Sequence, residues 1–265
     1  MRTCFLILVL QSYCLLYAKD YCSNVVRTQN GAYINIPSVM QIKKGCNLSS
    51  ATMLLQYFGI DVSPQELKSN RKRTQSYRSR TFVNQQVKSL GFQITKLPAT
   101  NLSEFSTSVK RAIDVGIPLW WECDLALAPT SDQQSKKKID LHRRLINGYI
   151  THKNKIIKIY YSDSWGEKHI NKQMRVIDAY RMSITNTSRL SLVYPNDLDP
   201  NILKAILPDE KFKVAQGAEN ELMSKQEVNT SPINKRPLPS WRKRQLETDR
   251  MADEILAKEA EKKGK

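Results

Sequence analysis

The apolar residues in the first half of the chain recur at helical spacing. The stretch Cys46–Tyr57, CNLSSATMLLQY, has a dense apolar pattern that predicts a buried helix, and Gly59 ends it. The pair Ser63–Pro64 places a capping residue before a first-turn proline, which predicts a short second helix. Two more helices are expected over residues 82–90 and 103–115, each followed at once by a glycine.

The pattern changes at Ile117 to short runs rich in β-branched and aromatic residues. Polar turns separate five such runs, at 117–124, 141–150, 155–164, 174–184 and 189–195. A helical N-terminal half followed by an antiparallel β half predicts an α+β fold. Apolar residues become sparse from Asp209 onward. We therefore expect one domain over residues 19–208 and a charged, partly helical or flexible tail over 209–265.

Residues 1–18 resemble a secretory signal peptide. Arg2 precedes the apolar run CFLILVL, and the segment ends on a small residue, Ala18. A membrane anchor is the alternative, but the apolar run is short and QSY interrupts it. We therefore expect a secreted or periplasmic protein with no transmembrane segment after removal of the signal.

Removal of the signal leaves three cysteines, Cys22, Cys46 and Cys123. An odd number in an exported protein suggests one disulfide and one thiol, and Cys22 with Cys123 is the obvious pair if Cys46 is the reactive residue. The three cysteines show no CxxC spacing, which argues against structural zinc, and we expect no metal and no cofactor.

The formal net charge of +17 changes the picture of possible partners. Basic clusters at residues 71–80, 136–138 and 143–144 form either a solvated surface or an attractive face for anionic partners. The sequence has no glycine-rich phosphate loop, zinc finger or aromatic–basic RNA motif, so no dedicated nucleic-acid binder is expected.

Cys46 is the first candidate for chemistry, because it opens the predicted buried helix. Unpaired N–H groups and the positive end of the helix dipole stabilise a thiolate at that position. His142 begins a predicted strand, and Asp163 ends the next one, immediately before Ser-Trp-Gly. A carboxylate there, screened by the indole of Trp165, would orient an imidazole. His152 and His169 fall in predicted turns and are taken as surface residues.

The cysteine that opens a buried helix, then H..LI.GY, then DSWG, in that order, resembles the papain-like cysteine peptidases. The chain is most similar to their bacteriocin-processing (double-glycine) peptidase-like branch, over about residues 36–195. The resemblance implies a papain-like fold in which Cys46 is the nucleophile, His142 is the general base and acid, and Asp163 orients the imidazole. It also implies that Gln41 donates to the oxyanion together with the main-chain N–H of Cys46.

Three functions fit these residues. The expected one is an exported cysteine peptidase acting on a peptide or protein substrate. The alternatives are a papain-like acyltransferase or amide hydrolase, and a catalytically silent basic binding module. If Arg144 and the lysines 136–138 border the cleft, acidic peptides are the expected substrates, with attraction that weakens in salt.

Overall fold

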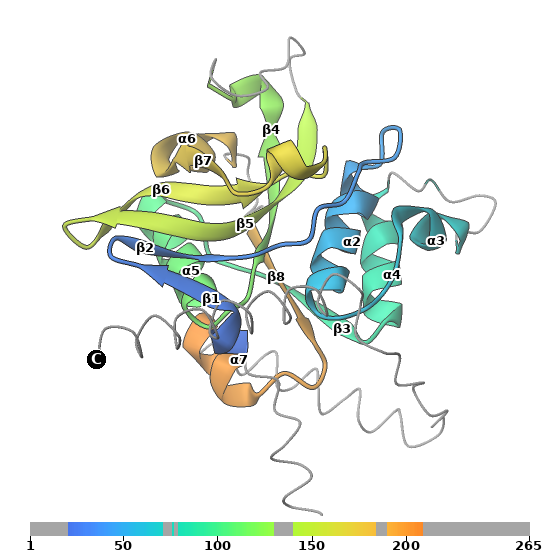
Figure 1. Cartoon of the computed structure of the whole chain (residues 1–265), viewed down its shortest axis with the longest axis horizontal. Coiled ribbons are helices and arrows are strands. Elements are labelled where there is room, and N and C mark those ends of the chain that lie inside the picture. Colours follow the sequence, from blue (N-terminus) through green and yellow to red (C-terminus); the bar gives the residue numbers. More distant parts are fainter. Residues whose placement is uncertain (1–20, 71–75, 77–78, 130–139, 184–189, 209–265) are drawn as a thin grey trace, which may run out of the picture.

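The computed structural model describes residues 21–70, 76, 79–129, 140–183 and 190–208 (Figure 1). The predicted signal peptide, the lysine run 136–138 and the predicted tail lie outside these residues. So does the side chain of Cys22, although its backbone is described.

Eight strands form one sheet in which every pairing is antiparallel. Their main order is β1-β2-β5-β4-β8-β3, and β6 adds to β5 and then carries β7. The bounds are β1 Val25–Thr28, β2 Gly31–Ile34, β3 Phe92–Lys96, β4 Leu119–Asp124, β5 Leu141–His152, β6 Lys155–Ser162, β7 Lys172–Arg175 and β8 Leu190–Pro195.

The long strand β5 organises the sheet. Its first half, from Leu141 to Ile146, pairs with β4, and residues 148–150 pair with β2. Strand β6 pairs with β5 from Leu145 to the hairpin at His152. The first residues of β5 therefore extend beyond the end of β6, and this is where His142 lies.

Helices pack around the sheet on several sides (Figure 1). Helix α2 packs on β5, α4 packs on β3, and α5 packs on β5, while α6 packs on β6. The bounds are α2 Cys46–Tyr57, α3 Pro64–Ser69, α4 Arg80–Ser89, α5 Leu102–Asp114, α6 Val176–Met182 and α7 Pro200–Ile206, with short 3-10 turns η1 Tyr21–Asn24, η2 Leu125–Leu127 and η3 Glu167–His169.

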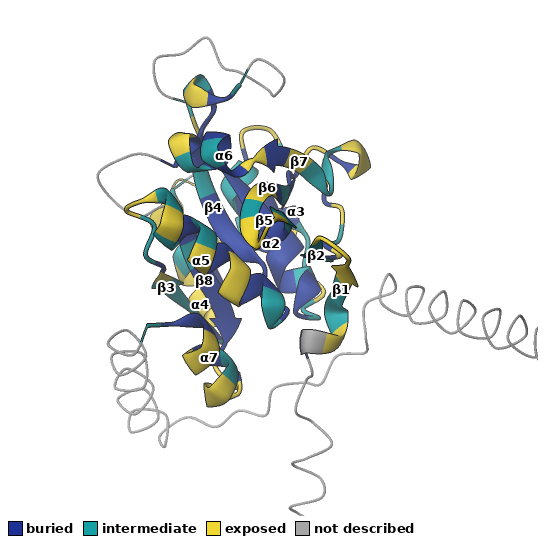
Figure 2. Cartoon of the chain, turned by 90° about the vertical axis from the view of Figure 1, so that its left-hand side faces the viewer, coloured by how far each residue is buried: buried dark blue, intermediate teal, exposed yellow. Residues whose placement is uncertain are grey.

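Helix α2 is the most buried of these helices. Nine of its twelve residues are buried, including Leu48 and Leu55, because it lies between the sheet and the pair α3 and α4. Figure 2 shows buried residues concentrated in α2 and the central strands, with exposed residues on the outer faces of α5 and α7. The expected buried helix starting at Cys46 is therefore present.

Two expectations need correction. Residues 174–184 were expected to form a strand, but only Met174 and Arg175 belong to β7, and α6 follows. Val176, Ala179 and Met182 are buried at three-residue spacing, which suits one helical face. The division into a helical and a β half is also incomplete, because β1, β2 and β3 from the first half belong to the same sheet, with β1 and β3 at two of its edges.

Candidate active site

Cys46 is the first residue of α2, as the sequence predicts. The preceding residue, Gly45, caps the helix without a side-chain hydrogen bond. The first amide groups of α2 therefore have no capping side chain and favour negative charge near the thiol. The Cys46 side chain is half-buried, and it lies close enough to the His142 imidazole for each group to shift the pKa of the other.

His142 and Asp163 meet because of the register between β5 and β6. Leu145 pairs with Ser162, so Asp163 follows the strand opposite the start of β5. The Nε2 atom of His142 lies 2.8 Å from Oδ1 and 3.0 Å from Oδ2 of Asp163. The imidazole is 7% exposed and the carboxylate 1%, so this contact is screened from water.

Arg144 is a third member of the buried cluster. Side chains alternate along a strand, so Arg144 lies on the same face of β5 as His142. Its Nε donates to Oδ2 of Asp163 over 2.9 Å, and its guanidinium lies 4.7 Å from the ring centroid of Tyr161. Asp163 therefore accepts hydrogen bonds from two cationic partners, which holds its carboxylate in one orientation.

The three titratable groups shift one another towards their charged forms. Burial alone raises the pKa of Cys46, but the hydrogen bond and charge of His142, with the main-chain N–H and charge of Arg143, lower it below its usual value. Burial alone lowers the pKa of His142, but the contacts with Asp163 and Cys46 raise it to about 9. Burial raises the pKa of Asp163, yet His142 and Arg144 bring it below its usual range. The lowered pKa of Cys46 and the raised pKa of His142 both shift the balance towards a thiolate–imidazolium pair.

The side chain of Gln41 is held in place by hydrogen bonds from the turn that follows Asp163. Its Oε1 accepts hydrogen bonds from Nε1 of Trp165 at 2.9 Å and from Oγ of Ser164 at 3.2 Å. An indole nitrogen can only donate, so the amide oxygen must face Trp165 and the amide NH₂ must face away from it. Gln41 therefore presents two N–H donors on its other side.

The turn 163–166 is built to hold these contacts. Gly166 has φ 94° and ψ −177°, a conformation that is accessible essentially to glycine alone. Met40 and Trp165 form an isolated antiparallel bridge, which ties the Gln41 segment to this turn. The ring of Trp165 also packs edge-on against His142, with centroids 5.6 Å apart. The indole therefore contacts both Gln41 and His142.

Sequence reasoning missed an apolar rim around these residues. Met40 is 68% exposed, Leu141 43% and Trp165 36%, and each is the immediate neighbour of Gln41, His142 or a residue of the 163–166 turn. Large hydrophobic residues at such exposure commonly mark binding surfaces. The signal was in the sequence, because each apolar residue adjoins a candidate site residue.

The structure thus brings Gln41, Cys46, His142 and Asp163 into one connected cluster, while His152 is exposed at the end of β5 and His169 packs on Trp165. The condition that Arg144 borders an open cleft is not met, and the lysines 136–138 lie outside the described residues, so the preference for acidic substrates stays a prediction. Arg144 is 1% exposed and its charge is balanced by Asp163, so it offers no charge to an open cleft.

The predicted disulfide between Cys22 and Cys123 can be compared with the structure only at Cys123, because the side chain of Cys22 is not described. Cys123 is present as a buried thiol whose Sγ donates to the main-chain oxygen of His142 at 3.6 Å. Within the described ranges, no helix is long and apolar enough to cross a membrane. The same residues contain no group of three or more His, Cys, Asp and Glu side chains suited to a metal ion.

Comparison with known proteins gives a consistent family match. The model of the Peptidase_C39-like family matches residues 33–188, which include all four candidate residues. A search of curated proteins found no match.

Similar solved structures include a C39-like peptidase from Bacillus anthracis, with 16% identity, coverage of 60% of this chain and 94% of that chain, and a TM-score of 0.40. A double-glycine-motif protease of an AMS/PCAT transporter, solved with its leader peptide, has 12% identity, coverage of 64% and 98%, and a TM-score of 0.39. The peptidase domain of Streptococcus ComA has 12% identity, coverage of 59% and 94%, and a TM-score of 0.35.

Proposed function

We propose, since the chain belongs to the Peptidase_C39-like family, that it is a cysteine peptidase whose nucleophile is Cys46. Family membership indicates cysteine peptidase activity, and the residue roles are our proposal. The single observation that supports them most strongly is the continuous line of contacts from Cys46 through His142 to Asp163, with the carboxylate fixed by Arg144.

The proposed reaction begins with the thiolate of Cys46 attacking the carbonyl carbon of a peptide bond. The carbonyl oxygen becomes an oxyanion, and the main-chain N–H of Cys46 and an amide N–H of Gln41 donate hydrogen bonds to it. The tetrahedral intermediate collapses, the C–N bond breaks, and the imidazolium of His142 gives its proton to the departing amine. The product is a thioester at Cys46.

Hydrolysis of the thioester uses the same residues in the reverse roles. Neutral His142 accepts a proton from water, and the resulting hydroxide attacks the thioester carbon. The C–S bond breaks, the carboxylic acid leaves, and the thiolate–imidazolium pair is restored. Asp163 bonds only Nε2 of His142, so Nδ1 is the ring nitrogen left to exchange protons with Cys46 and the substrate.

The direct test is cleavage of a complex peptide mixture in H₂¹⁸O by the purified protein. Mass spectrometry should find new termini whose carboxylates carry ¹⁸O, and Cys46→Ala should abolish them while Cys123→Ala should retain them. Products joined to added amines without ¹⁸O would indicate acyl transfer. No product from a folded protein that also resists thiol probes would indicate a silent binding module.

Export is a separate proposal that rests on the sequence of residues 1–18. The mature protein should begin near Lys19, as measured by intact mass and N-terminal peptide mapping after expression in the source cell. A mature chain that retains Met1 would contradict it.

A further inference from the structure

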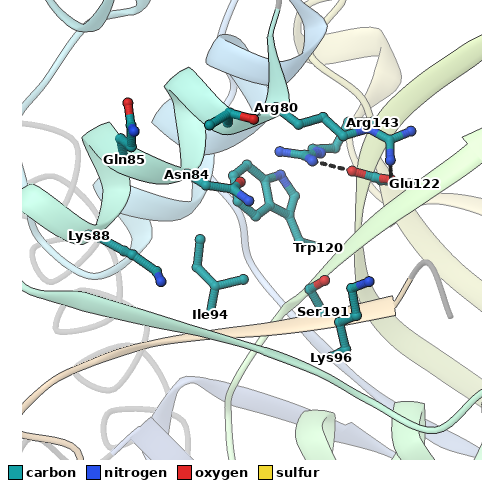
Figure 3. Close-up of a pocket in the computed structure, with 11 residues that line it drawn as sticks. Arg80, Asn84, Gln85, Lys88, Ile94, Lys96, Trp120, Glu122, Arg143 and Ser191 are labelled. Carbon is teal, nitrogen blue, oxygen red and sulfur yellow. Dashed lines mark hydrogen bonds and ion pairs between the residues drawn. The ribbon is translucent and has the colours of Figure 1, made fainter. Parts of the chain in front are cut away.

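A pocket lies next to Arg143, the residue that follows His142 in the chain. More cationic than acidic side chains line it. It has a volume of about 460 Å³ and lies among α4, β3, β4, β5 and β8 (Figure 3). Four of its eleven lining residues are cationic and one is acidic: Arg80, Lys88, Lys96 and Arg143 against Glu122. Figure 3 shows Asn84 on α4 pointing towards Trp120 and Lys88 on the same helix lying towards Ile94.

Arg143 gives this pocket its chemical character. It is 4% exposed, yet within the described part of the chain only its Nη2 has a hydrogen-bond partner, Glu122, while Nε and Nη1 have none. These two atoms carry three N–H bonds. Burying a guanidinium whose N–H groups lack hydrogen-bond acceptors costs free energy, unless a ligand or another group accepts hydrogen bonds from them. The Oδ1 atom of Asn84, on the same pocket wall, is likewise buried without a partner.

The guanidinium of Arg143 is also held rigidly. Its central carbon lies 3.9 Å from the ring centroid of Trp120, and Nε1 of Trp120 donates to Oγ of Ser50 on α2 over 3.0 Å. Glu122 bonds Arg80 at 2.9 Å as well as Arg143, so one carboxylate is shared between two guanidinium groups. A preorganised cation binds a ligand without losing much conformational entropy.

We propose that this pocket binds a small multivalent oxyanion of the phosphate or polycarboxylate type. Such a ligand supplies several acceptor oxygens for Arg143 and more than one negative charge for the excess of cations. A monocarboxylate supplies one charge and two oxygens, which is too few for the three N–H bonds on Nε and Nη1 of Arg143. The site does not depend on the proposed peptidase activity, because none of these pocket contacts involves Cys46 or His142 directly.

An occupant of the pocket would still affect Cys46. The groups that face the Cys46 thiol are His142 and Arg143, and Arg80 and Glu122 lie beyond Arg143. Arg143 lowers the pKa of Cys46 through its main-chain N–H and its charge. An added anion opposes that charge and disfavours the thiolate, so alkylation of Cys46 by iodoacetamide near neutral pH should become slower.

The test is calorimetric titration of the full chain with inorganic pyrophosphate, citrate and acetate at low ionic strength. One pyrophosphate or one citrate should bind per chain, and acetate should bind at least about tenfold more weakly. Lys88→Gln should weaken pyrophosphate binding about fivefold, as expected for one exposed charge. Lys158→Gln is the matched control, because it removes an exposed lysine from β6 outside the pocket. Pyrophosphate bound more tightly than citrate assigns a phosphate-type ligand, and the reverse order assigns a polycarboxylate.

Three results would overturn the proposal. These are the absence of saturable binding, equal weakening by Lys88→Gln and Lys158→Gln, and equal affinity for acetate and pyrophosphate. The second would mean that the chain attracts anions only through its general basicity. NMR can locate the bound anion independently. The indole N–H resonance of Trp120 should shift as pyrophosphate is added, while that of Trp165 should not.

Discussion

Replacing Asp163 by Asn tests the electrostatic basis of the site. The pKa of His142 is raised from 6.5 to about 9, which corresponds to about 3 kcal/mol in favour of the imidazolium. Asp163 makes the leading favourable contribution, ahead of Cys46. The substitution removes the negative charge but keeps the shape, and it leaves the charge of Arg144 uncompensated beside the ring. We therefore expect the pKa of His142 to fall to about 7–8.

The assay is NMR titration of the imidazole nitrogens, and the chain suits it because it contains three histidines in all. Asp178→Asn is the matched variant, because Asp178 is another buried aspartate bonded by an arginine, Arg175, at 2.7 and 2.9 Å. It should leave the titration of His142 unchanged.

Two outcomes would refute this reasoning. A wild-type midpoint near 6.5 would mean that His142 is not held in its charged form by its neighbours. An unchanged midpoint near 9 in folded Asp163→Asn would mean that the carboxylate does not raise the pKa. Because the variant also leaves Arg144 buried beside a neutral group, its unfolding midpoint must be measured, and a loss of about 3–5 kcal/mol is expected.

Further predictions follow from individual contacts. Gln41→Ala should lower kcat for peptide cleavage about 10²–10³-fold through loss of an oxyanion donor, while iodoacetamide alkylation, which forms no oxyanion, should change little. Gly166→Ala should lower the unfolding free energy by about 1–3 kcal/mol in denaturant titration, because alanine is strained at φ 94° and its Cβ would lie 3.0 Å from Cε of Met40. Arg144→Ala should be more destabilising than Arg175→Ala in thermal unfolding, because Arg144 is 1% exposed and Arg175 is a surface residue.

The parts predicted well from sequence are those with a strong local signal. The helix from Cys46 has a dense apolar pattern and a glycine stop. The strand that carries His142 and the strand that ends just before Asp163 are rich in β-branched and aromatic residues. The α6 segment was assigned wrongly because VIDAYRM is short and rich in residues that also suit strands. Its three-residue burial pattern arises from packing on β6, which no local rule specifies.

The remaining features depend on contacts that are distant in sequence. Arg144 looks like a surface cation beside other basic residues, and only the register of β5 with β6 makes it the partner of Asp163. The orientation of Gln41 depends on Trp165 and Ser164, more than 120 residues away. Strands β1, β2 and β3 are four or five residues long, so their periodicity is weak and the sheet edges that they extend determine their conformation.

The most direct test of the account is the pH dependence of Cys46 alkylation by iodoacetamide, followed by peptide mapping on the wild type and on His142→Ala. The account predicts that the apparent pKa of Cys46 in the wild type is lower than that of an ordinary thiol, and that it rises in His142→Ala because the neighbouring imidazolium is gone. It also predicts that Cys123, which is buried, reacts far more slowly. An apparent pKa near 9 for Cys46 in the wild type, unchanged by His142→Ala, would contradict the proposed ion pair and with it the proposed nucleophile.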